Sequence, residues 1–136
     1  GQSTGGTMSL IAAATQPCFA GAVSLAPFCT LDRILIDNPS AKSILESRFG
    51  PLHEKDHRAA DALTLTHGMN KPVFLIHGTD DRTVPIAHGK QLAEGIGASA
   101  KFVPVEGGDH HLRNVNRRAI IETILAWLDA QDRDSQ

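Results

Sequence analysis

Three short stretches of the sequence combine residue types that act together in nucleophilic catalysis. The first, Gly1-Gln2-Ser3-Thr4-Gly5, matches the pattern G-x-S-x-G. In that pattern the serine lies on a tight turn, where side chains two residues to either side would clash, and a helix follows at once. The N–H groups at the start of that helix lie near any negative charge that develops. Ser3 is therefore the candidate nucleophile.

The second stretch, His77-Gly-Thr-Asp-Asp-Arg-Thr-Val-Pro85, follows an apolar run and could supply an acid. An aspartate just past a buried strand can accept a proton from a histidine and hold that ring in one tautomer. Asp81 is the candidate and Asp80 the alternative. The competing interpretation is that both aspartates cap a turn or the next helix. For His77 we expect a structural role at the strand end.

The third stretch, Val105-Glu-Gly-Gly-Asp-His-His-Leu-Arg-Asn114, could supply a general base. A histidine on such a loop can take a proton from the serine. Two other interpretations are an exposed polar loop and a metal site built from Asp109, His110 and His111. Adjacent residues seldom point the right way to bind one ion, which disfavours the metal site.

The elements that must position these residues alternate between helix and strand. Periodicity and turn residues predict helices at 5–15, 85–98 and 116–131 and strands at 20–27, 72–78 and 100–108, the last near a sheet edge because of Pro104. Region 28–70 has no clean period, with short helices expected at 38–50 and about 54–63. This alternation predicts a parallel sheet with helices on its faces. The three stretches then fall at strand carboxyl ends, where active sites of such sheets lie.

The last predicted helix carries one apolar stripe that we expect to face the core. Its members are Ile120, Ile121, Ile124, Leu125 and Leu128.

Composition narrows the class of protein further. The 136 residues allow one domain, and 41% hydrophobic and 21% charged residues are typical of a globular chain. A net charge of −2 gives no basis for nucleic-acid binding, and no apolar run is long enough for a membrane segment. Cys18 and Cys29 lie in apolar sequence, so we expect both to be buried and reduced, with a disulfide between them as the alternative. The expected location is cytoplasmic.

The chain resembles the C-terminal half of an α/β-hydrolase, in the branch of prolyl-oligopeptidase-like domains, small esterases and serine aminopeptidase-like lipases. Residues 72–85, PVFLIHGTDDRTVP, resemble that branch's strand and acid loop, H-G-x-x-D-x-x-V-P, which implies Asp81 as the acid. EGGDHHL resembles the histidine loop and favours His110 over His111, and GQSTGG resembles the turn that carries Ser3.

The resemblance implies about three parallel strands with flanking helices and a short cap-like insert at about 28–70. We therefore expect residues 1–136 to be a partial α/β-hydrolase domain whose N-terminal half is missing. It also implies that substrate choice depends on the insert.

The function implied is a serine hydrolase that cleaves an ester, thioester or amide through an acyl-enzyme, without cofactor or metal. A carboxylesterase or lipase-like enzyme is the leading reading, and a serine peptidase of prolyl-oligopeptidase type is the alternative. The N–H of Thr4 would be one oxyanion donor. A second donor would come from a loop earlier in the fold, so we expect these 136 residues alone to be inactive or nearly so.

Two other classes of function compete with this one. A metal-dependent phosphoesterase would use Asp80, Asp81, Asp109, His110 and His111 as ligands, but it leaves the G-x-S-x-G stretch unexplained. A hydrolase-fold binding protein would need none of Ser3, Asp81 and His110. The expected partner is a small ester, thioester or peptide substrate.

Overall fold

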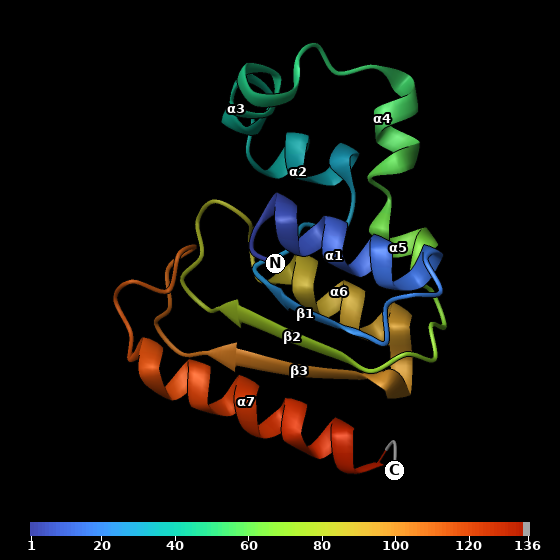
Figure 1. The fold of residues 1–136 in the computed structure, drawn as a ribbon. Coiled ribbons are helices and arrows are strands. Elements are labelled where there is room, and N and C mark those ends of the chain that lie inside the picture. The colour runs from blue at the N-terminus through green and yellow to red at the C-terminus, as the bar shows by residue number, and fades with distance from the viewer. Residues whose placement is uncertain (135–136) are drawn as a thin grey trace.

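Three parallel strands form the centre of the computed structural model, which describes residues 1–134 (Figure 1). In chain order the elements are α1 (Thr4–Thr15), β1 (Ala22–Leu25), α2 (Leu31–Asp37), α3 (Ser40–Phe49), α4 (Glu54–Ala59), α5 (Ala62–Leu65), β2 (Val73–Gly78), α6 (Ala87–Ile96), a 3-10 turn (Gly97–Ser99), β3 (Ala100–Val105) and α7 (Arg117–Asp134). The predicted α/β class and the three parallel strands are confirmed.

The strands lie in the order β1-β2-β3, with β2 in the middle. Leu25 pairs with Ile76, and Gly78 pairs with Val105, so the carboxyl ends of the strands meet at one edge of the sheet. Pro104 lies on β3, at the outer side of this sheet, as its missing N–H predicts.

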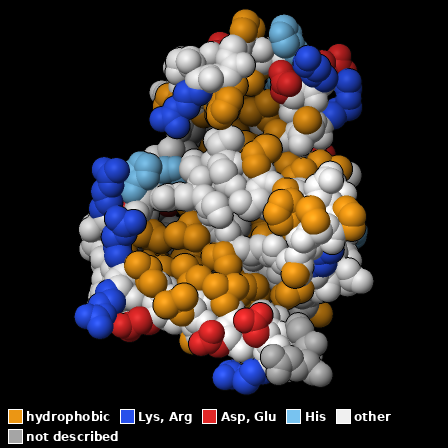
Figure 2. Space-filling model, viewed as in Figure 1, with side chains coloured by type: hydrophobic (Ala, Val, Ile, Leu, Met, Phe, Trp, Pro, Cys, Tyr) orange, Lys and Arg blue, Asp and Glu red, His pale blue; other side chains and the backbone are white. Residues whose placement is uncertain are grey.

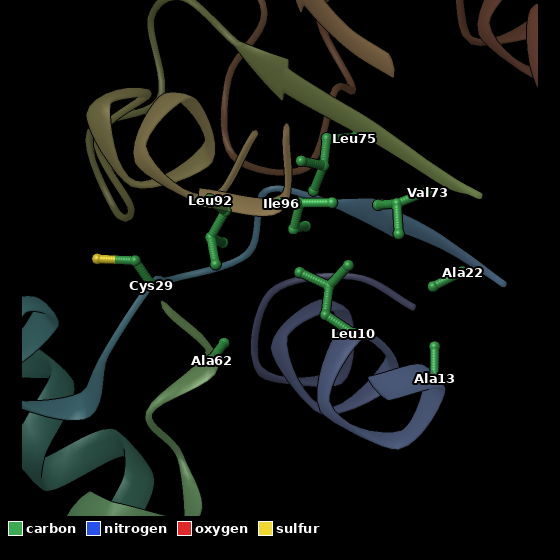
Figure 3. Close-up of a cluster of buried hydrophobic side chains, with 9 residues drawn as sticks. All are labelled: Leu10, Ala13, Ala22, Cys29, Ala62, Val73, Leu75, Leu92 and Ile96. Carbon is green, nitrogen blue, oxygen red and sulfur yellow. The ribbon is translucent and has the colours of Figure 1, made fainter. Parts of the chain in front are cut away.

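Alternate residues of β2 supply the two faces of the sheet. Val73 and Leu75 pack in a cluster with Leu10 of α1 and with Leu92 and Ile96 of α6 (Figure 3). The residues between them, Phe74 and Ile76, point to the opposite face, where α7 packs. All six residues of β2 are buried, which explains why this run is almost continuously apolar.

Helix α7 contacts the sheet with a narrower face than the sequence predicts. Ile120, Ile124 and Trp127 pack against the sheet, and the Trp127 ring stacks on Phe74 at 5.3 Å between centroids. The prediction that the other three members of the stripe face the core is wrong, because each of them is at least 41% exposed. They are Ile121, Leu125 and Leu128. The spacing 120, 124, 127 is one helical face, and the three exposed residues lie beside it.

The segment between β1 and β2 carries four short helices, of which α2, α3 and α4 stand beyond α1 as seen from the sheet (Figure 1). Helix α2 was not predicted. Thr30 caps it, because its hydroxyl accepts a hydrogen bond from Arg33 N. The helix predicted at 38–50 is confirmed as α3. The one predicted at 54–63 divides into α4 and α5, because Asp61 caps a new helix by accepting from Thr64 N.

The two cysteines differ in their surroundings. Cys29 is 1% exposed, which confirms its predicted burial. Cys18 is exposed, so that prediction is wrong. Its neighbour Phe19 is also 48% exposed, so the apolar sequence around Cys18 does not mark a core segment.

Of the helices in residues 1–134, none combines the length and apolar character that crossing a bilayer requires.

Two adjacent glycines of α1 should respond differently to alanine. A Cβ atom on Gly6 would lie 2.9 Å from the carbonyl oxygen of Leu25, whereas one on Gly5 would meet nothing within 4 Å. We expect Gly6→Ala to lower the free energy of unfolding by about 1–3 kcal/mol through overpacking. The matched control Gly5→Ala should leave it unchanged or raise it by up to about 1 kcal/mol, because alanine favours helix. Denaturant unfolding measures both, and equal stabilities would contradict this packing argument.

Candidate active site

Ser3 lies on a sharp turn between an extended residue and α1. Gln2 forms a parallel bridge with Leu25 at the end of β1, and Ser3 N donates to Leu25 O at 2.8 Å. Ser3 itself has φ of 56° and ψ of −126°, a conformation that non-glycine residues rarely adopt. The helix begins at the next residue. This turn presents the hydroxyl at the carboxyl edge of the sheet.

The glycines around Ser3 are not equally required. A Cβ on Gly1 would lie 2.2 Å from Gly5 O, and Gly6 is crowded by Leu25 O and Ser24 Oγ. Gly5, by contrast, has open space around it. The prediction that a side chain at Gly5 would clash is therefore wrong, and Gly6 is the crowded position on the helix side.

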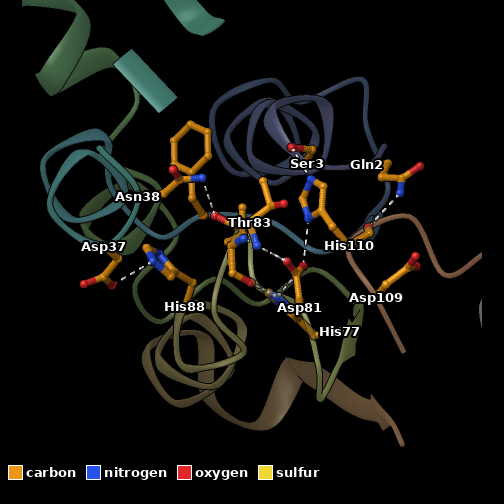
Figure 4. A network of polar contacts seen from close by, with 12 residues as sticks. Gln2, Ser3, Asp37, Asn38, His77, Asp81, Thr83, His88, Asp109 and His110 are labelled. Carbon is orange, nitrogen blue, oxygen red and sulfur yellow. Dashed lines mark hydrogen bonds and ion pairs between the residues drawn. The ribbon is translucent and has the colours of Figure 1, made fainter. Parts of the chain in front are cut away.

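Of the two adjacent histidines, His110 contacts Ser3. Its Nε2 atom lies 3.0 Å from Ser3 Oγ, and the residue is 8% exposed (Figure 4). His111 is exposed and makes an edge contact with the His110 ring, at 5.0 Å between centroids. The loop after β3 holds this arrangement with Gly107 at φ of 68° and Leu112, buried, at φ of 52°.

Of the two adjacent aspartates, Asp81 contacts His110. Nδ1–H of His110 donates to Asp81 Oδ2 at 2.7 Å, and the carboxylate has no exposed surface. Its other oxygen, Oδ1, accepts from the N–H groups of Thr83 and Val84 at 2.9 and 2.8 Å. Asp80 is exposed and donates its backbone N–H to Gly108 O. The capping contacts expected of a loop aspartate are thus present on Asp81 together with the histidine contact.

Burial alone would raise the pKa of Asp81. Hydrogen bonds from His110, His77 and the Val84 N–H outweigh that effect and hold the pKa of this carboxyl well below its usual range. Asp81 therefore stays ionised at neutral pH, and a proton on Nδ1 of His110 is the tautomer that it favours. Nε2 of His110 is then free to accept from the Ser3 hydroxyl.

Ser3, His110 and Asp81 thus form one continuous line of hydrogen bonds, although they lie far apart in the sequence. Thr4 is the first residue of α1, so no carbonyl inside the helix can accept its N–H. Thr4 directly follows Ser3, so its N–H is the helix donor that comes first after the candidate nucleophile. The arrangement can transfer a proton from a hydroxyl to an imidazole and bind a negative charge beside it.

Two contacts near this line were not foreseen from the sequence. Gln2 donates through Nε2 to His110 O at 3.0 Å, which ties the residue before Ser3 to the histidine loop. His88 is 1% exposed. Its Nδ1 accepts from Cys29 N, and its Nε2 lies 3.2 Å from Asp37 Oδ2. His88 belongs to no motif, and Gln2 fills a variable position of G-x-S-x-G, so the sequence gave no signal for these contacts.

A metal site is not evident in the described part of the chain. Within residues 1–134, no three His, Cys, Asp or Glu side chains are grouped as ligands of one ion. The cluster that a metal-dependent phosphoesterase would require, including Asp80 and His111, is therefore not assembled.

The fold and the family follow from comparison with known proteins. A 2,6-dihydroxy-pseudo-oxynicotine hydrolase superposes with a TM-score of 0.77 at 25% identity, over 94% of this chain and 38% of its own. A puromycin-hydrolyzing peptidase of Mycobacterium tuberculosis gives 0.69 at 24% identity, over 81% of this chain and 18% of its own. The esterase domain of a Rhodothermus marinus protein gives 0.68 at 20% identity, over 93% and 58%.

All three are longer than this chain, which spans less than two thirds of each. Their likeness shows the α/β-hydrolase fold. The model of the prolyl oligopeptidase family matches residues 1–133, nearly the whole sequence. The chain therefore belongs to the prolyl oligopeptidase family of serine hydrolases.

Proposed function

We propose that this chain carries the catalytic residues of a serine hydrolase that cleaves an ester or amide bond through an acyl-enzyme. The observation that carries the proposal is the hydrogen-bonded line from Ser3 Oγ through His110 to Asp81, at 3.0 and 2.7 Å. A nucleophile, a base and an acid within these distances have the geometry that acyl transfer needs. A binding protein of the same fold would have no use for such a line.

In the first step Ser3 Oγ attacks the carbonyl carbon, and its proton moves to His110 Nε2. The carbonyl oxygen becomes an oxyanion, which the N–H of Thr4 stabilises. The C–O or C–N bond then breaks, and the leaving group takes the proton from His110. Water attacks the acyl-Ser3 ester with His110 as base again, which releases the acid and restores the Ser3 hydroxyl. Asp81 stabilises the imidazolium throughout.

Two apolar cavities lie on the side of the insert, one lined by Ser3 and the other by its neighbour Thr4. Figure 2 shows apolar side chains gathered within the insert, at the top of the view. The smaller, about 60 Å³, is lined by Ser3 itself. The larger, about 250 Å³, lies between α1 and the insert. Both are bounded by Thr4, Phe28 and Leu45. We propose that the substrate presents an uncharged, apolar group to these cavities.

Both ester and amide bonds suit this mechanism, and the matched proteins include both kinds of enzyme. One of the matched proteins is a peptidase and another is an esterase domain, and the family is named for an oligopeptidase. We propose a carboxylesterase-like activity on apolar acyl groups, with peptide hydrolysis of prolyl-oligopeptidase type as the alternative. Parallel assays of p-nitrophenyl esters and of peptidyl p-nitroanilides would decide between them.

Replacing the nucleophile should abolish the reaction. We expect Ser3→Ala to lower kcat at least about 10⁴-fold and to prevent covalent labelling by a fluorophosphonate, because no hydroxyl remains to be acylated. The matched control is Ser9→Ala, in the same helix, where the hydroxyl donates only to Gly5 O. Labelling is read by intact-protein mass spectrometry. Activity of the full-length protein that survives Ser3→Ala, or a full-length wild-type protein that is not labelled, would contradict the proposal.

The adjacent histidines allow a direct test of which one is the base. His110→Gln should lower kcat by about 10³-fold or more, because Nε2 of His110 is the atom beside Ser3 Oγ. His111→Gln should change kcat less than about threefold, because its ring is exposed and only touches that of His110. Steady-state kinetics measures both variants. Equal losses would show that the base has not been identified.

Leu45, the wall shared by the two cavities, should set the size of the apolar group. Leu45→Ala joins the cavities, so the ratio of kcat/KM for long over short acyl esters should rise about tenfold. Leu45→Met, which keeps the volume, is the matched control. The ratio does not depend on the fraction of folded enzyme, so a loss of stability cannot mimic the result. An unchanged ratio in Leu45→Ala would exclude these cavities as the acyl site.

A further inference from the structure

A second histidine lies against the carboxylate of Asp81. His77, near the end of β2, has no exposed surface. Its Nε2 atom lies 2.8 Å from the carbonyl oxygen of Val84 and 3.3 Å from Asp81 Oδ2. The same Oδ2 atom is 2.7 Å from Nδ1 of His110. Two imidazole rings, one on β2 and one on the loop after β3, therefore approach one oxygen atom (Figure 4).

The surroundings of His77 determine which of its nitrogens carries hydrogen. The Val84 carbonyl can only accept, so Nε2 of His77 is the donor. Nδ1 of the same ring is buried and has no hydrogen-bond partner among the described residues. It faces α6 at Gly89, where an added Cβ would lie 2.6 Å away. A second N–H would be buried without an acceptor, so the ring is neutral.

A neutral histidine at this position has a cost that a leucine would not have. A buried nitrogen without a partner destabilises the folded state, and such an atom in a native structure needs an explanation. The opposite end of the ring provides one, because Nε2–H donates to Val84 O and lies 3.3 Å from Asp81 Oδ2. We infer that His77 is a positioning residue, whose Nε2–H restrains the Asp81 carboxylate and shares Oδ2 with His110.

This inference rests on the proposed function only in taking Asp81 as the partner of the base. The titratable groups that face His110 are Asp81 from the loop after β2 and the adjacent His111. His77 approaches the same Asp81 oxygen, and His88 from α6 is the other titratable group near His77. A neutral donor on Oδ2 withdraws negative charge from the contact with His110. Removing that donor leaves the carboxylate free to stabilise the His110 imidazolium more strongly.

The test is the titration of His110 in the full protein. We expect His77→Leu to raise the midpoint of the acid limb of kcat/KM by about half a pH unit or more. His77→Gln should restore the wild-type midpoint, because its amide N–H reaches the position of Nε2. His77→Asn places its N–H toward Gly89 instead and should behave like His77→Leu. The Gln and Asn pair decides the question even where His77→Leu does not fold.

A second readout separates this inference from the proposed function. The His110 ring nitrogens can be titrated by ¹⁵N NMR without any substrate, and the same upward shift is expected in His77→Leu and His77→Asn. His88→Leu is the matched control for the loss of a buried histidine and should leave His110 unchanged. A midpoint that is unchanged or lowered in the folded variants overturns the positioning role. A wild-type protein that hydrolyses nothing overturns the proposed function, and the NMR titration still decides the role of His77.

Discussion

A carboxylate with no exposed surface determines the arrangement at the carboxyl edge of this sheet. Burying a charge is very unfavourable unless hydrogen bonds replace the lost water. Asp81 meets this need by receiving Thr83 N and Val84 N on Oδ1 and His110 Nδ1 on Oδ2, with His77 Nε2 close to the latter. The loop after β2 must therefore curl around the acid, and the loop after β3 must come to it. Ser3 then needs only to be within reach of the same imidazole.

The parts of this arrangement that the sequence predicted are those that local pattern controls. An apolar run closed by glycine identifies β2, and a parallel sheet brings the strand ends together, so the order of Ser3, Asp81 and His110 along the chain was enough to expect their contact. The preference for His110 over His111 came from the family resemblance. The contacts agree with it because His110 turns inward and His111 outward. The catalytic roles of these residues remain predictions.

The parts that were missed depend on tertiary packing, which has no local signature. Apolar residues beside the buried face of α7, such as Leu125, satisfy a helical period without being buried. Gly6 is crowded only because β1 passes beneath it, and Gly5 is not. Helix α2 depends on one cap at Thr30 and on packing within the insert. The contact of His77 with Asp81 joins residues four apart, yet it exists only because the loop folds back on the end of β2.

Helix α6 links the acid to the insert that borders the cavities. Gly89 has no side chain, and this leaves the space that the His77 ring occupies. The preceding residue, His88, contacts Cys29, just before α2, and Asp37, the last residue of α2. Burial lowers the pKa of His88, although Asp37 opposes that effect, so this contact is made by a neutral ring. The adjacent residues His88 and Gly89 of α6 therefore contact both the insert, at Cys29 and Asp37, and the His77 ring that lies beside Asp81.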